Sequence, residues 1–324
     1  MSTARTIWPL SFLQRDKGHQ VIFLAEQEIA DIAKTGDDSV FEGAHIVILS
    51  RINGVITRYD PWEKARSQGT KIVYETDDDL TGEYRDLGQE AKLECAVKWA
   101  DAVTVSTPHL GEVMGRYGKP VYVLPNLVDV EWYDRARHAK REVDGVTIGL
   151  LGTATHFFDW LLVLDALKEI KARFPHAQVV TAGYPAPFME QVEGTLYFQP
   201  VPFQDYPALL AQIDIRLCPI DTGDPFNKSK SGIAALEAAA ATRAIKGKRV
   251  GGCISIASDC EQYRRCGAIL VENTTEAWVD AIASLLSDKG KRLRLSESCH
   301  EAVRQFDVPR GNELREQVYQ EIVG

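Results

Sequence analysis

Short apolar segments alternate with longer helical stretches along this chain, and this alternation constrains the fold more than any other feature. In the first part, strands are predicted at 20–24, 45–49, 71–74, 102–105 and 121–124. Helices are predicted at 60–68, 88–100 and 108–117. Strands that alternate with helices are typical of a parallel sheet with crossover helices, so the chain is predicted to be an α/β protein.

A charged stretch at 134–145 interrupts this rhythm, and a second series follows it. Its strands are predicted at 146–151, 178–182, 195–198, 214–218, 253–257 and 268–271, and its helices at 159–173, 206–212, 231–244, 275–288, 290–304 and 310–323. Two such series predict two Rossmann-like, doubly wound domains that face each other across a ligand-binding cleft. We place the first domain at 1–140, the second at 141–305, and at 306–324 a helix expected to cross back to the first.

Composition and missing motifs argue against several classes of function. The net charge is −9, from 37 Lys and Arg against 46 Asp and Glu, which does not favour a general polyanion-binding surface. We find no apolar run of the ~20 residues that a membrane span needs and no signal-peptide layout. The six cysteines form no CxxC pair and fit free thiols in a reducing compartment, so we expect a cytoplasmic protein. The sequence also lacks GxGxxG, Walker A, HExxH and GxSxG motifs. Their absence argues against hydride transfer, P-loop phosphoryl transfer, a zinc peptidase and a serine hydrolase.

A polar loop that runs into an alanine-rich helix, at 224–241, is the most informative stretch for function. Lysines and serines alternate at its start, at Lys228, Ser229, Lys230 and Ser231. We expect Ser229 or Ser231 to cap the helix, whose N-terminal N–H groups attract anions. Lys230 and Glu237 are seven residues apart, so on one helix they share a face about 10 Å long. That span suits a diphosphate and a ribose diol, while an ordinary amphipathic helix explains the pattern equally well.

The segment 226–231 followed by Glu237 and Ala238 resembles the donor-site signature of GT-B glycosyltransferases of the family 4-like group. Segments 100–108, 123–129 and 148–152, the last with His156 and Asp159, agree with it in order and spacing across roughly 70–300. The resemblance implies two Rossmann-like domains and a nucleotide-diphosphate sugar, for which UDP-glucose is the commonest choice, as co-substrate. It also implies hexose transfer to a hydroxyl acceptor with retention of configuration. We expect no permanently bound cofactor, no metal site and no required divalent metal.

The resemblance also implies roles for individual residues. Lys230, His156 and Glu237 are the catalytic candidates, because they would hold the leaving diphosphate and the ribose. The donor-binding candidates are Gly152, Thr153, Asn227, Lys228, Ser229, Ser231, Tyr184 and Phe203, the two aromatic residues having surface positions as their alternative. The acceptor-side candidates are Arg51, Glu75, Asp77, Asp78 and His109. Four carboxylates at 75–79 repel one another unless a cation or a basic group lies close, and they could equally cap a helix.

Two departures from the family pattern leave alternatives open. Ser229 stands where many relatives carry a glutamate, which allows a catalytically inert sugar-nucleotide-binding subunit. A basic insertion at 242–252 carries Arg243, Lys246, Lys248 and Arg249. Basic side chains can bind DNA phosphates, so they suggest that the acceptor is a hydroxymethylated pyrimidine in DNA, as in phage-type enzymes. Solvated surface charges are the simpler interpretation. A saccharide or lipid acceptor, and an epimerase or phosphorylase on the same architecture, also remain open.

Overall fold

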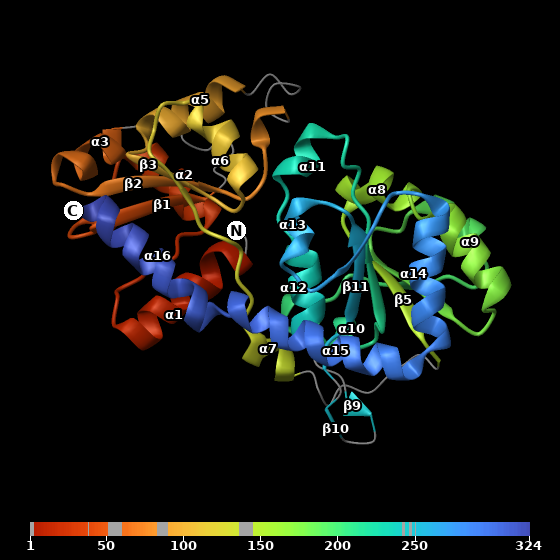
Figure 1. Ribbon diagram of the computed structural model, residues 1–324. Coiled ribbons are helices and arrows are strands. Elements are labelled where there is room, and N and C mark those ends of the chain that lie inside the picture. The colour runs from red at the N-terminus through yellow and green to blue at the C-terminus, as the bar shows by residue number, and fades with distance from the viewer. Residues whose placement is uncertain are drawn as a thin grey trace. The chain divides into compact units, whose positions relative to one another are not determined.

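The chain divides into two units (Figure 1), and the short segment Lys228–Ser231 groups with the first of them. The first unit comprises Met1–Leu127, Lys228–Ser231 and Val308–Gly324, and the second comprises Val128–Asn227 and Gly232–Asp307. The computed structural model describes residues 3–37, 39–50, 60–82, 90–135, 145–241, 244–245, 248–249 and 251–324.

Four parallel strands form the sheet of the first unit, in the order β1-β2-β3-β4. They are β1 (Ile46–Ser50), β2 (Lys71–Thr76), β3 (Ala102–Val105) and β4 (Val121–Val123). The helices that connect them are α3 (Asp60–Ser67), α5 (Glu90–Trp99) and α6 (Pro108–Gly115). The two central strands are almost entirely buried, which is why their apolar runs are nearly continuous. The described strands of this unit follow one another in sequence order, without a reversal.

Helices from both ends of the chain complete the first unit. The turn η1 (Thr3–Ile7), α1 (Trp8–Lys17), α2 (Glu26–Thr35) and η2 (Ser39–Phe41) precede β1, and α16 (Val308–Val323) ends the chain. Asn312 Nδ2 of α16 donates to Pro9 O at 2.7 Å, so the C-terminal helix packs on α1. The strand predicted at 20–24 is wrong: this segment forms no regular secondary structure, pairs with no described strand, and leaves Ile22 69% exposed. A run of high strand propensity forms a strand only beside a hydrogen-bonded neighbouring strand, and the described residues supply none for 20–24.

Six parallel strands form the sheet of the second unit, in the order β12-β11-β8-β5-β6-β7. They are β5 (Thr147–Gly152), β6 (Gln178–Gly183), β7 (Leu196–Phe198), β8 (Ile215–Cys218), β11 (Ile254–Ser258) and β12 (Ile269–Val271). The sequence order reverses between β5 and β8, as in doubly wound nucleotide-binding sheets. The predicted fold class, α/β with two Rossmann-like domains, is thus confirmed, and the reversed strand order expected of a doubly wound sheet is present in the second unit.

Helices cover both faces of this sheet (Figure 1). The helices are α7 (Val130–Asp134), α8 (Phe157–Leu161), α9 (Leu164–Arg173), α10 (Tyr206–Leu210), α11 (Pro225–Ser229), α12 (Ile233–Ala240), α13 (Glu261–Arg264), α14 (Thr275–Ser287) and α15 (Lys289–Val303). Single turns are η4 (Ala154–His156), η5 (Pro187–Gln191), η6 (Phe203–Asp205) and η7 (Arg304–Phe306). Trp278, Ile282 and Leu285 lie on one face of α14 and pack in the core cluster that α9 also joins. Burying each such side chain contributes about 1.5–3 kcal/mol.

Two helix predictions need correction. The helix predicted at 159–173 is two helices, α8 and α9, separated at 162–163. The helix predicted at 231–244 begins only at Ile233, after Gly232 as N-cap, and ends at Ala240. The chain then forms an antiparallel pair, β9 (Ala244–Ile245) with β10 (Lys248–Arg249), in the basic insertion. No helix in the described part of the chain has the length and apolar character to cross a membrane.

Candidate functional site

The point where the strand order reverses positions the candidate site of the second unit. Ligands of doubly wound sheets bind beyond the carboxyl ends of the strands at such a point. The pair that meets there is β5, which ends at Gly152, and β8, which ends at Cys218. The segments that follow these two strands therefore supply the side chains to consider first.

A hydrogen-bonded network joins these two segments through the carboxylate of Asp159. Asp159 Oδ2 lies 2.9 Å from His156 Nδ1, both on the segment that follows β5. Asp159 Oδ1 accepts from Asp221 N at 2.8 Å and from Asn227 Nδ2 at 2.9 Å, both after β8. The Asp159 side chain is 3% exposed and that of His156 is 31% exposed. A buried carboxylate at Nδ1 fixes the imidazole and leaves Nε2 as the nitrogen that can meet a ligand.

Two glycines keep the backbone close beneath this histidine. A Cβ at Gly152 would lie 2.8 Å from His156 Cδ2, nearer than real Cβ contacts come. Gly183, at the end of β6, has φ +91°, and a Cβ there would lie 2.4 Å from Gly152 O. Tyr184 N donates to Gly152 O at 2.9 Å, and the Tyr184 ring packs against the core beside Phe157. Thr153 is exposed, with its hydroxyl 2.8 Å from that of Thr155.

Glu237 lies in a second network, with a buried arginine and tyrosines. Tyr206 Oη donates to Glu237 Oε2 at 3.0 Å, and Arg216 Nη1 lies 3.5 Å from the same oxygen. Burial raises the pKa of Glu237, and the Arg216 charge opposes that rise. Burial and the Glu237 charge raise the pKa of both Tyr133 and Tyr206, so both phenols stay protonated and can donate to the carboxylate. The Glu237 side chain remains 20% exposed.

Phe203 extends the aromatic part of this second network. Its ring stacks on Trp132 with centroids 4.6 Å apart and an interplanar angle of 11°. Trp132 in turn meets Tyr133 edge to face at 4.9 Å. Phe203 thus packs with the neighbours of Glu237, while Tyr184 packs beside the His156 segment.

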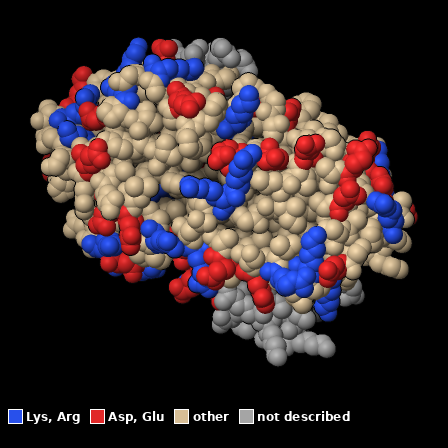
Figure 2. Space-filling view, in the orientation of Figure 1, with Lys and Arg blue, Asp and Glu red and all other residues tan. Residues whose placement is uncertain are grey.

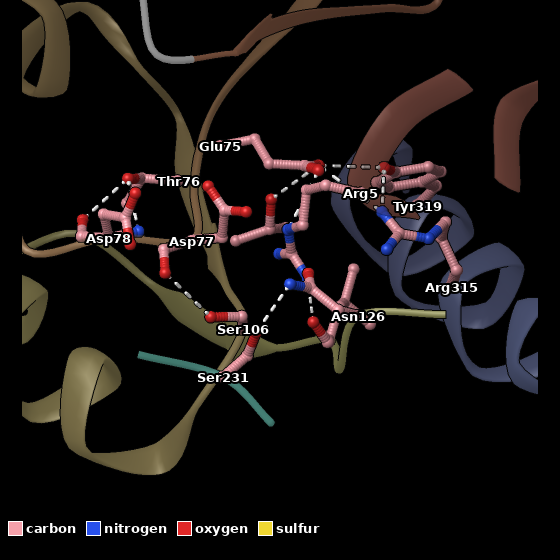
Figure 3. A network of polar contacts seen from close by, with 12 residues as sticks. Arg5, Glu75, Thr76, Asp77, Asp78, Ser106, Asn126, Ser231, Arg315 and Tyr319 are labelled. Carbon is pink, nitrogen blue, oxygen red and sulfur yellow. Dashed lines mark hydrogen bonds and ion pairs between the residues drawn. The ribbon is translucent and has the colours of Figure 1, made fainter. Parts of the chain in front are cut away.

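The lysine- and serine-rich segment 228–231 belongs to the first unit. Thr107 Oγ1 donates to Ser229 O at 3.1 Å. Asn126 Nδ2 donates to Ser231 Oγ at 2.8 Å (Figure 3). The expectation that either serine caps the following helix is wrong, because the N-cap is Gly232, which has no side chain that could cap the helix. Lys230 also precedes α12, so the helical face that we expected it to share with Glu237 does not exist.

The acidic run at 75–79 finds its positive neighbours in residues from both ends of the chain. Glu75 is fully buried, with Arg5 Nε 3.0 Å from its Oε1 and Arg315 Nη1 3.4 Å from its Oε2 (Figure 3). Thr104 Oγ1 donates to the same carboxylate at 3.1 Å, and Tyr319 Oη at 3.4 Å. Burial and the Glu75 charge raise the pKa of Tyr319 to about 12. Glu75 therefore holds the sheet, the N-terminal turn and α16 together.

The neighbouring acidic residues form a turn at the end of β2. Ser106 Oγ donates to Asp77 O at 3.3 Å, and Thr76 Oγ1 donates to Asp78 O at 2.9 Å. Asp77 and Asp78 are half-buried.

His109, the remaining described acceptor-side candidate, lies in the first turn of α6. Its Nδ1 is 3.8 Å from Glu112 Oε2, and both side chains are exposed.

Several candidates fall outside what the structure describes. Arg51, Arg243 and Lys246 lie outside the described residues, and of Lys248 and Arg249 only the backbone, as β10, is described. On the face drawn in Figure 2, the basic and acidic side chains of the described residues are interspersed. Within the described residues, no group of three or more His, Cys, Asp or Glu side chains is arranged to hold a metal ion.

Sequence reasoning missed the long-range partners of Glu237, of Glu75 and of the 228–231 segment. The spacing of His156 and Asp159 was visible, because residues three apart meet on a helical turn. The partners that come from other elements carry no such local signal; they are Arg5, Thr107, Asn126, Tyr206, Arg216 and Arg315.

Known proteins resemble this chain in part of its sequence and in its fold. Residues 145–288 match the family model described as Glycosyl transferases group 1. No curated protein sequence matches the chain. Among solved structures, it is similar to sucrose-phosphate synthase from Thermosynechococcus elongatus, with a TM-score of 0.62 and 13% identity over 94% of this chain and 81% of that one. It is also similar to Anabaena HepE, solved in complex with UDP and glucose (TM-score 0.68, 14% identity, 91% and 82% covered).

A third similar structure is a UDP-forming α,α-trehalose-phosphate synthase from Burkholderia xenovorans (TM-score 0.64, 11% identity, 99% and 84% covered). At such low identity these likenesses establish the fold, which is the two-domain α/β fold called GT-B.

Proposed function

We propose that this chain, which carries a group 1 glycosyltransferase domain on a GT-B fold, moves a hexose from UDP-glucose or a related nucleotide-diphosphate sugar to a hydroxyl acceptor in the cytoplasm, with retention of configuration. The observation that carries the proposal is the Asp159 carboxylate, which ties His156 to Asp221 and Asn227 where the strand order reverses. This network lies within the segment that matches the family.

The chemistry that this proposal requires is stabilisation of a leaving diphosphate. The bond from the anomeric carbon to the β-phosphate oxygen breaks, a bond from that carbon to the acceptor oxygen forms, and the acceptor proton passes to the departing phosphate. His156 and the backbone of Gly152 and Thr153 would hold the phosphates, and Lys230 would add positive charge. Preorganised donors of this kind stabilise the developing charge without a protein nucleophile. The proposal needs no permanently bound cofactor and no divalent metal.

Glu237 is proposed to accept hydrogen bonds from the ribose hydroxyls. Its carboxylate is held by Tyr206 and Arg216 but is still 20% exposed. The test compares UDP with 2′-deoxy-UDP by calorimetry. The unaltered protein should prefer UDP, and Glu237→Gln should lose most of that preference. An unchanged preference in this variant would limit Glu237 to a structural role with Arg216.

The central test is titration of the protein with UDP, GDP and UDP-glucose. We expect one nucleotide to bind and His156→Ala and Lys230→Ala each to weaken it by about tenfold or more, because each removes a charge-assisted contact. The exposed His176 supplies the matched control, since His176→Ala should bind as the unaltered protein does. If no nucleotide binds, the proposal is overturned.

Turnover is tested separately. Nucleotide binding without turnover for any acceptor would instead support an inert binding subunit. The anomeric configuration of a product, read by NMR, tests retention.

A DNA acceptor is the finer proposal attached to the basic insertion. Its backbone forms the β9–β10 pair, which carries Lys248 and Arg249. If the insertion binds phosphates, affinity for hydroxymethylated duplex should fall steeply as salt rises. Replacing Arg243, Lys246, Lys248 and Arg249 with alanine should abolish that binding. A lack of binding at low salt would exclude DNA and favour a saccharide or lipid acceptor.

A further inference from the structure

The backbone on both sides of Lys230 is held by side chains of the first unit. Ser229, immediately before it, accepts a hydrogen bond at its main-chain oxygen from Thr107 Oγ1 at 3.1 Å. Ser231, immediately after it, accepts one at Oγ from Asn126 Nδ2 at 2.8 Å. Thr107 follows β3 and Asn126 follows β4, so the ends of two adjacent strands supply the two donors.

The Thr107–Ser229 hydrogen bond is buried, and the Asn126–Ser231 hydrogen bond is partly buried. Ser229 is 0% exposed, Asn126 is 3% exposed and Thr107 is 9% exposed. A buried carbonyl that loses its donor cannot be satisfied by solvent, so the Ser229 backbone is strongly constrained to this position. The buried Thr107 contact therefore restricts the segment more tightly than an exposed hydrogen bond would, and the partly buried Asn126 contact adds a second point of attachment.

The Thr107 hydroxyl serves two partners at once. It caps α6 by accepting from Leu110 N at 3.3 Å, and its own proton is donated to Ser229 O. A cap requires only the acceptor lone pair. The donor half of the hydroxyl is thus available for the 228–231 segment, and its use there is separate from the capping of α6.

We propose that Thr107 and Asn126 are positioning residues that set the backbone on either side of Lys230 and so present Lys230 to the donor diphosphate. This inference rests on the proposed function, which assigns Lys230 to that diphosphate. Neither residue touches the nucleotide in this scheme; both act through residues 229 and 231.

The test is a double-mutant cycle on UDP affinity, measured by calorimetry on the full chain. Thr107→Val removes the hydroxyl at nearly constant shape, and we expect the Kd for UDP to rise about fivefold to tenfold, as for loss of one well-placed contact. In the Lys230→Ala background the same change should alter the Kd less than about twofold, because the side chain that it positions is absent. Thr107→Ser keeps both hydrogen bonds and should restore the affinity. Asn126→Ala, carried through the same cycle, gives an independent second case.

A matched control separates positioning from loss of a helix cap. Thr274 caps α14 through a hydrogen bond from Ala277 N at 3.2 Å, so Thr274→Val removes a cap without touching 228–231. It should lower the thermal midpoint but leave the UDP Kd unchanged. Equal effects of Thr107→Val with and without Lys230 would overturn the positioning role while leaving the proposed function intact. Failure of UDP and GDP to bind the unaltered protein would overturn both.

Discussion

Asn227 Nδ2 donates to Asp159 Oδ1 at 2.9 Å, a contact between residues 68 positions apart in sequence. It ties the segment after β8 to the helix after β5, at the point where the sheet reverses its order. Gln262 Nε2 donates to Asn227 O at 2.9 Å, so the segment after β11 joins the same arrangement. One asparagine therefore links the ends of three neighbouring strands.

Asp159→Asn should weaken this arrangement. The amide keeps the volume but loses the charge, and its NH2 group faces a donor that it cannot accept from. Hydrogen bonds to charged groups contribute about 1.5–3 kcal/mol, so we expect a destabilisation of that size by urea unfolding. UDP binding should weaken as well, because His156 loses its fixed orientation. Asp165→Asn on α9, with a side chain 76% exposed, is the control and should change neither quantity. Equal behaviour of the two variants would show that the Asp159 network does not support the site.

Two glycine substitutions should separate function from stability. In Gly152→Ala the new methyl would lie 2.8 Å from the His156 ring, and we expect the ring to be displaced and UDP affinity to fall about tenfold, as loss of a charge-assisted contact implies. In Gly183→Ala the methyl would meet the Gly152 carbonyl oxygen at 2.4 Å with φ +91°, which no side chain can relieve. That variant should unfold at markedly lower urea concentration. If Gly152→Ala instead lowered stability without weakening UDP binding, the position of the His156 ring would not depend on the absence of a side chain at residue 152.

The fold was predictable from the sequence because it depends on local pattern. Segments such as 71–74 and 146–151 are apolar, short and followed by helical stretches, and both became strands. The segment 20–24 has the same composition but failed, since strand formation requires a partner that a local pattern does not reveal. The helix expected at 231–244 was placed too early because Gly232, rather than a serine, begins it.

The candidate site was predictable only where its residues are close in sequence. His156 and Asp159 are three residues apart, and they do form a hydrogen bond. The contact of Thr107 with Ser229 spans 122 positions, and that of Arg315 with Glu75 spans 240. Such pairs are brought together by tertiary packing, so no spacing rule applied to one sequence identifies them.

Glu75→Gln should severely destabilise the protein. The substitution removes the only carboxylate that Arg5 and Arg315 are both seen to contact within the described residues, and both guanidinium groups are 1% exposed. Removing one member of a buried charge network costs about 3–5 kcal/mol, because the remaining charges stay buried. Urea unfolding should register a loss of that size. Glu112→Gln, with a side chain 80% exposed, should be neutral. A stable Glu75→Gln protein that failed only in acceptor use would instead favour the acceptor-side role considered for Glu75.

The free energy of unfolding should also fall at alkaline pH, because the folded chain keeps several buried cysteine thiols protonated. Burial raises the pKa of the Cys260 and Cys299 thiols to about 11 and that of Cys266 to about 12, each from 9.0. The unfolded chain loses these protons first, so the stabilisation is complete below about pH 9 and is lost as pH rises toward 12. Urea midpoints measured from pH 7 to pH 11 should be flat at first and then decline. Replacing Cys266 with alanine should make the decline shallower. A midpoint that stays constant to pH 11 would show that these thiols ionise in the folded protein as readily as in the unfolded chain.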